Sequence, residues 1–239
     1  MKSTVSLLSK IKLLAIILNI ETATKNCSVS LAKNGRLMTF KELNDSSYSH
    51  GENLHVFIED IIKDANIAFS DIEAIAVSKG PGSYTGLRIG VSSAKGLSFS
   101  LDKPLIAVDT LGSLARSVEI RENEIVIPLL DARRMEVYSA VFDANYTKIR
   151  ETKAEVIDKN SFQEYLKKGK VYFLGDGAEK CKEILTHKNA IFLDGYFPSA
   201  KQMAEVSYEK YSQNDMEDVA YFEPFYLKDF LITTPKIRK

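Results

Sequence analysis

Apolar and polar positions in the first half of the chain predict a regular series of short strands and amphipathic helices. Continuous apolar runs predict buried strands, and alternation on either side of Asn34-Gly35 predicts a hairpin. The expected strands are at 14–21, 26–33, 36–42, 72–78 and 104–108, and the expected helices are at 49–65, 87–99 and 110–118. This half therefore reads as three strands, a helix, a strand and a helix, with one more short strand and helix before residue 120.

The second half repeats this order. We expect strands at 124–130, 135–142, 148–157, 170–174 and 191–193, and helices at 161–168, 178–185 and 199–211. Such a duplication predicts two lobes, each a mixed sheet covered by helices. The predicted boundaries are an N-terminal extension at 1–12, a first lobe at 13–119 and a second lobe at 120–239. The repeated order is that of the α/β fold shared by actin, sugar kinases and Hsp70, a duplicated ribonuclease H-like (ASKHA) architecture.

A glycine-rich turn between an expected strand and an expected helix is the most informative local feature. Gly80-Pro81-Gly82 predicts a tight turn, and Ser83 or Thr85 can cap the helix that follows. Glycines cost stability inside a helix, so the row Gly86, Gly90 and Ala94 indicates a face that another backbone or a ligand approaches closely. Five residues separate Gly80 from Gly86, and Leu87-Arg88 follows, which excludes a P-loop. Phosphate binding at the start of the helix and close helix packing both remain open.

Composition narrows the class of partner. The 239 residues include 32 basic and 32 acidic side chains, so no net charge attracts the protein to nucleic acid or to an anionic membrane, and an RNA role needs a local patch or a partner. Cys27 and Cys181 are the only cysteines, which argues against a disulfide framework and fits a reducing compartment. The apolar run at 13–20 is too short for a membrane helix. We expect a cytoplasmic protein with no membrane association.

Candidate chemical groups are few. His50 and His55 are five residues apart, so a regular helix does not bring them onto one metal ion, and His187 is distant in sequence. Asp131 and Glu136 are either a carboxylate pair for acid–base catalysis or part of a charged hairpin turn. The adjacent Arg133 and Arg134 could contact RNA phosphates, and Cys27 is expected to be a buried apolar side chain. We therefore expect no catalytic and no metal-ligating residue.

Several blocks in this order resemble the TsaB family, also called YeaZ. They are residues 17–24 with Cys27-Ser28-Val29, residues 80–90, Asp131-Ala132-Arg133 followed by Glu136-Val137-Tyr138, and residues 223–227. In the superfamily, the turn at 19–24 contacts nucleotide phosphates, and catalytic members usually place an aspartate there. This chain has Glu21 and no glycine-rich turn, which argues against ATP hydrolysis by the chain alone.

The resemblance implies a non-catalytic, scaffolding subunit in bacterial tRNA modification. In that system TsaD, the catalytic paralogue, transfers a threonylcarbamoyl group from its AMP conjugate to N6 of adenosine 37 of tRNA. TsaB binds TsaD, and the ATPase TsaE joins them. The resemblance implies no cofactor for this chain alone. ATP or ADP is a candidate ligand at the contact with TsaD. The chain would meet tRNA through the complex. A homodimer through the same helices is the alternative when TsaD is absent.

The resemblance also assigns an interface to the two helices at 49–65 and 83–99. The implied contact residues are His50, Leu54, Phe57, Ser83, Tyr84, Thr85, Gly86, Leu87, Arg88, Gly90, Val91, Ala94 and Lys95. On this basis, the row of small residues Gly86, Gly90 and Ala94 along the second helix lets TsaD approach closely. A bulky charged residue at Gly90 is then expected to abolish TsaD binding and leave the monomer folded.

Two enzymatic alternatives remain at this point. One is a stand-alone ATP-dependent enzyme of the same superfamily, in which Gly175-Asp176-Gly177 lines a nucleotide site. The other is a glycoprotease-like (M22-type) metallopeptidase. ATP turnover or peptide cleavage by the purified chain would distinguish either from the scaffold.

Overall fold

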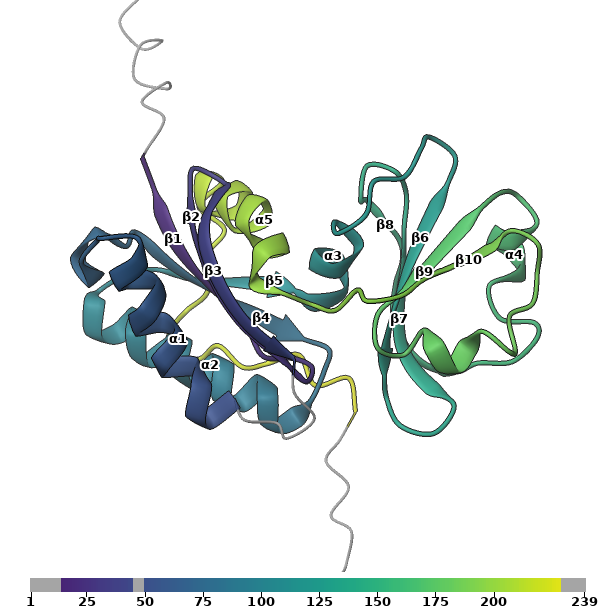
Figure 1. Cartoon of the computed structure of the whole chain (residues 1–239), viewed down its shortest axis with the longest axis horizontal. Helices are drawn as coiled ribbons and strands as arrows, with labels where there is room; N and C mark the ends of the chain where they lie inside the picture. The colour runs from purple at the N-terminus through teal and green to yellow at the C-terminus, as the bar shows by residue number, and fades with distance from the viewer. Residues whose placement is uncertain (1–13, 45–49, 229–239) are drawn as a thin grey trace, which may run out of the picture.

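Two five-stranded sheets form the cores of two lobes in the computed structural model, which describes residues 14–44 and 50–228 (Figure 1). The extension expected at 1–12 lies outside the described residues. No helix of the described part is long and apolar enough to cross a bilayer.

The first sheet has the order β3-β2-β1-β4-β5. Its strands are β1 (Ile16–Glu21), β2 (Asn26–Lys33), β3 (Arg36–Asn44), β4 (Ala74–Gly80) and β5 (Leu105–Asp109). β1, β4 and β5 run parallel, whereas β2 and β3 are joined to β1 as an antiparallel meander. Helices cover both faces of the central strand β1, which explains why its residues are continuously buried and do not alternate between buried and exposed.

The second sheet repeats the first, with the order β10-β9-β6-β7-β8. Its strands are β6 (Ile125–Asp131), β7 (Glu136–Phe142), β8 (Lys148–Val156), β9 (Val171–Leu174) and β10 (Ala190–Leu193). β6 holds the place of β1, with an antiparallel neighbour on one side and a parallel one on the other. The same strand order in both sheets confirms the predicted duplication and the fold class.

Helices α1 (His50–Asp64) and α2 (Tyr84–Leu101) pack side by side on one face of the first sheet (Figure 1). The apolar stripe of α1 and the inner face of α2 bury Leu54, Ile58, Val91 and Ala94 against the strands. A short helix, α3 (Thr110–Ala115), follows β5 and packs mainly on β6 and β7, so it bridges the two lobes. The 3-10 helix η2 (Phe69–Asp71) precedes β4.

Helix α5 (Ala200–Ser212) corrects the predicted domain boundary. It packs on the first sheet, opposite α1 and α2, where Met203 joins Ile17 and Ile106 in one apolar cluster (Figure 1). Glu217 then forms a β-bridge to Leu105. Residues 200–217 therefore return to the first lobe, although the prediction assigned them to the second.

The helices of the second lobe are shorter than predicted. Only α4 (Gln163–Leu166) and the 3-10 helix η3 (Glu179–Cys181) form where helices at 161–168 and 178–185 were expected. Cys181 and Leu185 still enter the core, because hydrogen bonds between residues three apart carry the chain past η3. Apolar spacing alone does not separate such turns from a regular helix.

The glycine-rich segment packs against the turn between β1 and β2. Ser83 caps α2, and its backbone N–H donates to the carbonyl of Ala23 at 2.6 Å. A Cβ atom at Gly86 would lie 2.1 Å from the carbonyl oxygen of Thr22, and one at Gly90 would lie 2.2 Å from Thr22 Oγ1. Thr22 Oγ1 also donates to the Gly86 carbonyl at 2.7 Å. The row of small residues is therefore required by contact within the lobe.

Glu21, the last residue of β1, is fully buried beside this turn. Its Oε1 accepts hydrogen bonds from the Ala23 N–H at 2.6 Å and from Ser78 Oγ at 2.8 Å. Its Oε2 has no hydrogen-bond partner among the described residues. Burial raises the pKa of Glu21 from its usual 4.5 to about 7, against the lowering effect of those hydrogen bonds. The carboxyl is a core group and is not presented to solvent.

We predict that Gly86→Ala destabilises the protein by about 1–3 kcal/mol, because the added methyl group meets backbone that cannot move away cheaply. Gly96→Ala is the matched control on the same helix, since nothing lies within 4 Å of its Cβ position. It should raise the free energy of unfolding by about 0.5–1 kcal/mol through helix propensity. Urea unfolding measures the free energy of unfolding of both variants. Equal changes for the two substitutions would contradict the close packing at Gly86.

We predict that the free energy of unfolding of the wild type falls, relative to Glu21→Gln, as the pH rises from about 4.5 to about 7. In that range the folded state binds a proton that the unfolded state has released, so stability decreases with pH. The difference should reach roughly 3 kcal/mol and level off above pH 7. Urea unfolding of both proteins between pH 4.5 and 8 tests this, and parallel stability curves would contradict it.

Candidate functional site

The inner face of α2 is not available to a partner. Leu87, Gly90, Val91 and Ala94 are buried, as are Gly86 and, on α1, Leu54. The lobe itself occupies the space beside these residues, which the sequence analysis assigned to TsaD. A Cβ atom at Gly90 would meet Thr22, so a charged residue there is expected to disturb the fold of the monomer as well as the binding of TsaD.

Four of the predicted interface residues point away from this core. Thr85 and Arg88 are exposed, and Ser83 and Tyr84 are half-buried at the start of α2. The guanidinium of Arg88 lies 4.3 Å from the centre of the Tyr84 ring. These side chains remain predicted contacts. Phe57 is half-buried against the core, and the side chain of His50 lies outside the described residues.

A C-terminal segment, residues 217–228, crosses one side of α2. Lys95 Nζ donates to the carbonyls of Ala220 and Phe222 at 3.1 and 3.0 Å. The rings of Tyr84 and Tyr226 lie 4.9 Å apart, and the Phe225 N–H donates to the Lys79 carbonyl at 2.7 Å. Lys95, predicted as a partner contact, is therefore engaged within the chain.

The outer face of α2 carries a second row of small residues that the sequence analysis missed. Ser92, Gly96 and Ser100 are exposed and four residues apart, and Phe99 beside them is 84% exposed. Val56 on the adjacent helix α1 is 52% exposed, and His55 Nε2 lies 3.3 Å from Ser93 Oγ across the helix pair. The four-residue spacing of this row was visible in the sequence, but it is the same spacing as that of the buried row.

The glycine turn of the second lobe is closed in the same way as that of the first. A Cβ at Gly175 would lie 2.3 Å from the Leu129 carbonyl oxygen, and one at Gly177 would lie 2.9 Å from the backbone of Leu130. The Gly177 N–H donates to Leu129 at 2.9 Å, just as Ser83 donates to Ala23. A phosphate-binding turn needs free N–H groups and open space. In this turn the N–H of Gly177 is already bonded to Leu129, and the backbone of β6 fills the space.

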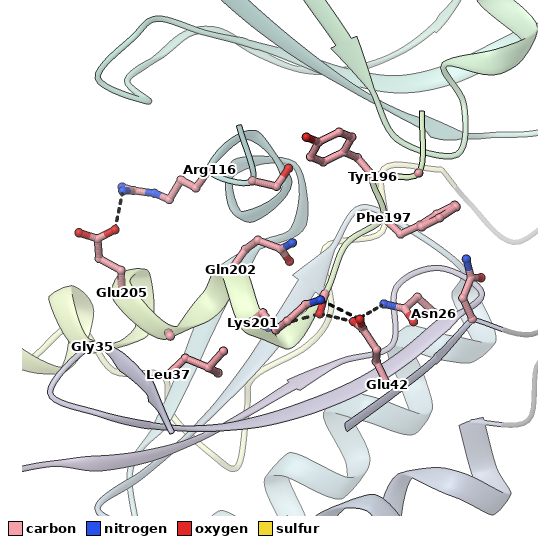
Figure 2. Close-up of a pocket in the computed structure, with 15 residues that line it drawn as sticks. Asn26, Gly35, Leu37, Glu42, Arg116, Tyr196, Phe197, Lys201, Gln202 and Glu205 are labelled. Atoms are coloured by element: carbon pink, nitrogen blue, oxygen red, sulfur yellow. Dashed lines mark hydrogen bonds and ion pairs between the residues drawn. The ribbon is translucent and has the colours of Figure 1, made fainter. Parts of the chain in front are cut away.

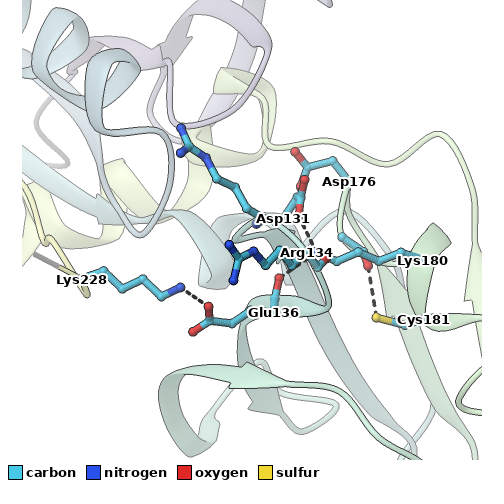
Figure 3. Close-up of polar contacts among 9 residues, drawn as sticks. Asp131, Arg134, Glu136, Asp176, Lys180, Cys181 and Lys228 are labelled. Carbon is cyan, nitrogen blue, oxygen red and sulfur yellow. Dashed lines mark hydrogen bonds and ion pairs between the residues drawn. The ribbon is translucent and has the colours of Figure 1, made fainter. Parts of the chain in front are cut away.

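The carboxylates at the β6–β7 hairpin are held by lysines (Figure 3). Lys180 Nζ donates to Asp131 Oδ1 and, at 2.7 Å each, to the carbonyls of Arg134 and Glu136. Lys228, from the C-terminal segment, pairs with the Glu136 carboxylate. Asp131 and Glu136 therefore form two separate ion pairs, which favours the hairpin interpretation over a catalytic pair.

Asp176 lies next to Asp131 of this hairpin (Figure 3). Its Oδ1 accepts from the Asp131 N–H at 3.0 Å, and burial raises the pKa of its carboxyl. Both cysteines are also inert, because burial raises the pKa of Cys27 to about 12 and that of Cys181 to about 11. In the described part of the chain, no group of three or more His, Cys, Asp or Glu side chains is arranged to hold a metal ion.

A polar hollow of about 700 Å³ lies where α5 meets β3 and the linker after β10 (Figure 2). On its floor Glu42 accepts from Lys201 and Ser199, each at 2.7 Å. Desolvation raises the pKa of Glu42, but the hydrogen bonds from these two residues outweigh it and hold the pKa below its usual range. Arg116 likewise pairs with Glu205. The charged groups of the hollow compensate one another and leave no net charge to attract an ionic ligand.

Comparisons with known proteins agree with this architecture. The sequence profile of the family described as "TsaD: tRNA N6-adenosine threonylcarbamoyltransferase" matches residues 44–235. The "tRNA threonylcarbamoyladenosine biosynthesis protein TsaB" of Escherichia coli is 29% identical over 221 residues, which cover 89% of this chain and 94% of that protein. The protein of the same name from Buchnera aphidicola subsp. Schizaphis graminum is 30% identical over 70% of this chain and 81% of that protein.

Relatives of the catalytic type match a shorter part. The "tRNA N6-adenosine threonylcarbamoyltransferase" of Bacillus thuringiensis (strain Al Hakam) is 38% identical over 108 residues, 39% of this chain and 32% of that protein. The solved structure "YeaZ from Pseudomonas aeruginosa" superposes with a TM-score of 0.73 at 23% identity, covering 90% of this chain and all of that one. The chain thus belongs to the tRNA N6-adenosine threonylcarbamoyltransferase family and, within it, to the TsaB (YeaZ) branch.

Proposed function

We propose that this protein is the non-catalytic scaffold of the machinery that makes threonylcarbamoyladenosine at position 37 of tRNA. It binds the catalytic paralogue TsaD through the outer face of α1 and α2. The ATPase TsaE joins this pair, and tRNA is modified by TsaD. The relatives named TsaB, as tRNA threonylcarbamoyladenosine biosynthesis proteins, support the pathway.

The closed glycine turns carry the non-catalytic part of the proposal. The backbone of Thr22 and Ala23 fills the space beside α2, and the backbone of 129–131 fills the space beside Gly175 and Gly177. These are the two places that the sequence analysis considered for contact with a nucleotide. Glu21, at the position of the usual catalytic aspartate, is sealed in the core. In the described part of the chain, neither of these turns therefore offers an open cradle, and the carboxyl of Glu21 is not accessible to a phosphate.

The outer face of α1 and α2 supports the partner. Small side chains at Ser92, Gly96 and Ser100 let a second helix approach closely, and Val56 and Phe99 offer exposed apolar surface at the same face. The likeness to TsaD relatives over 108 residues favours a quasi-symmetric contact, in which equivalent helices of two related chains pair. A homodimer through this face competes with TsaD, and ATP or ADP at the contact remains a prediction.

We predict that Gly96→Arg abolishes co-elution with TsaD from the same organism in size-exclusion chromatography. The arginine projects into open space, so the monomer should fold, but it fills the gap that a partner helix needs. Gly96→Ala is the matched control and should retain the complex. Circular dichroism verifies the fold of both variants, and a stable complex with the arginine variant would place the interface elsewhere.

We predict that the purified chain has no ATP turnover and no peptidase activity above background, with or without added Mg²⁺ or Zn²⁺. The sealed Glu21 and the closed turns are the physical reason. Release of inorganic phosphate and cleavage of a fluorogenic peptide are the measurements. Metal-dependent turnover by the chain alone would favour the stand-alone enzyme or the metallopeptidase instead.

A further inference from the structure

The β6–β7 hairpin presents two adjacent arginines that the scaffold role does not use. Arg133 and Arg134 are exposed at its turn, and both have left-handed backbone conformations, with φ of +72° and +52°. Neither side chain forms an ion pair with any residue of the described chain. Such a conformation costs free energy for residues other than glycine, so the surrounding contacts must hold it.

Those contacts come from one lysine and two aspartates. Lys180 uses three donors on the hairpin, two of them on the carbonyls of Arg134 and Glu136. Asp131 Oδ1 accepts from the Arg133 N–H at 2.9 Å, and Asp176 holds the Asp131 N–H (Figure 3). The nearby carboxylates are thus already engaged, so neither guanidinium group has an ion-pair partner within residues 14–44 and 50–228.

Further cations come to the same place from distant parts of the chain. Lys25, on the β1–β2 turn of the first lobe, is exposed, forms no ion pair within the described chain, and lies close enough to Asp176 to lower the pKa of that carboxyl. Lys228 arrives with the C-terminal segment. Cations therefore outnumber carboxylates here, although the whole chain has zero net charge: Lys25, Arg133, Arg134, Lys180 and Lys228 against Asp131, Glu136 and Asp176.

We propose that Arg133 and Arg134 contact phosphates of the RNA substrate, so that this chain binds tRNA directly as well as supporting TsaD. The proposal rests on the function proposed above. A guanidinium group matches a phosphate with paired hydrogen bonds, and a turn held in advance loses little entropy on binding. RNA is favoured over a protein partner because no large apolar side chain of residues 131–136 is exposed, as the centre of a protein interface would require.

The test compares two double variants in the reconstituted complex of the full chain with TsaD. Arg133→Ala/Arg134→Ala removes the proposed contacts. Lys167→Ala/Lys168→Ala removes the same charge from an exposed site at α4 in the same lobe. Fluorescence anisotropy with an unmodified tRNA transcript should show affinity about tenfold lower for the arginine variant, with the slope of log K against log salt smaller by about 1.5. The lysine variant should stay within about twofold of wild type.

Three further results are decisive. Unchanged tRNA affinity in the arginine variant, with TsaD still bound, overturns the proposal. Loss of TsaD from the arginine variant also overturns it, because the hairpin is then a protein contact. If the wild-type chain does not bind TsaD, the scaffold function fails; the same transcript is then titrated into the chain alone, where equal binding by the wild type and the arginine variant overturns the RNA contact independently.

Discussion

The close approach of helix α2 to the turn between β1 and β2 is the contact on which the rest of the first lobe depends. Gly86 and Gly90 let the helix touch the backbone and side chain of Thr22, and Ser83 ties the start of the helix to Ala23. This contact fixes the helix over the sheet and decides which of its faces is turned outward. It also fills the space beside the start of the helix, where the sequence analysis left phosphate binding open. One packing constraint therefore removes a potential ligand site and defines an outer surface.

The second lobe has the same close packing of a glycine turn, made by different residues. Gly175 and Gly177 lie against the end of β6, and Gly82 and Gly86 lie against the turn that follows β1. The duplication thus preserves the close packing of a glycine turn on the central strand in each sheet. What differs is the covering layer: α1 and α2 are long, whereas η3 and α4 are short. Among the described residues, only the first lobe therefore has an extended helical face.

The two proposed surfaces lie on separate lobes and would bind their partners through different interactions. On the outer face of α2, the exposed row of Ser92, Gly96 and Ser100 carries no charge, and its small side chains permit close helix packing. The β6–β7 hairpin has almost no exposed apolar surface and an excess of positive charge. The C-terminal segment connects them, because it passes along α2 and then delivers Lys228 to the hairpin. A scaffold that holds both a protein and an RNA needs such a separation.

Hydrophobic periodicity determined the strands, the long helices and the duplication, because burial of one face imposes a period of two or 3.6 residues on the sequence itself. It did not separate the buried row of Gly86, Gly90 and Ala94 from the exposed row of Ser92, Gly96 and Ser100, since both have small residues at the same spacing. Nor did it place α5 on the first sheet, or Lys180 on a hairpin more than forty residues earlier in the chain. The tertiary structure decided these points, because which surface covers a given face depends on contacts between segments that are distant in sequence.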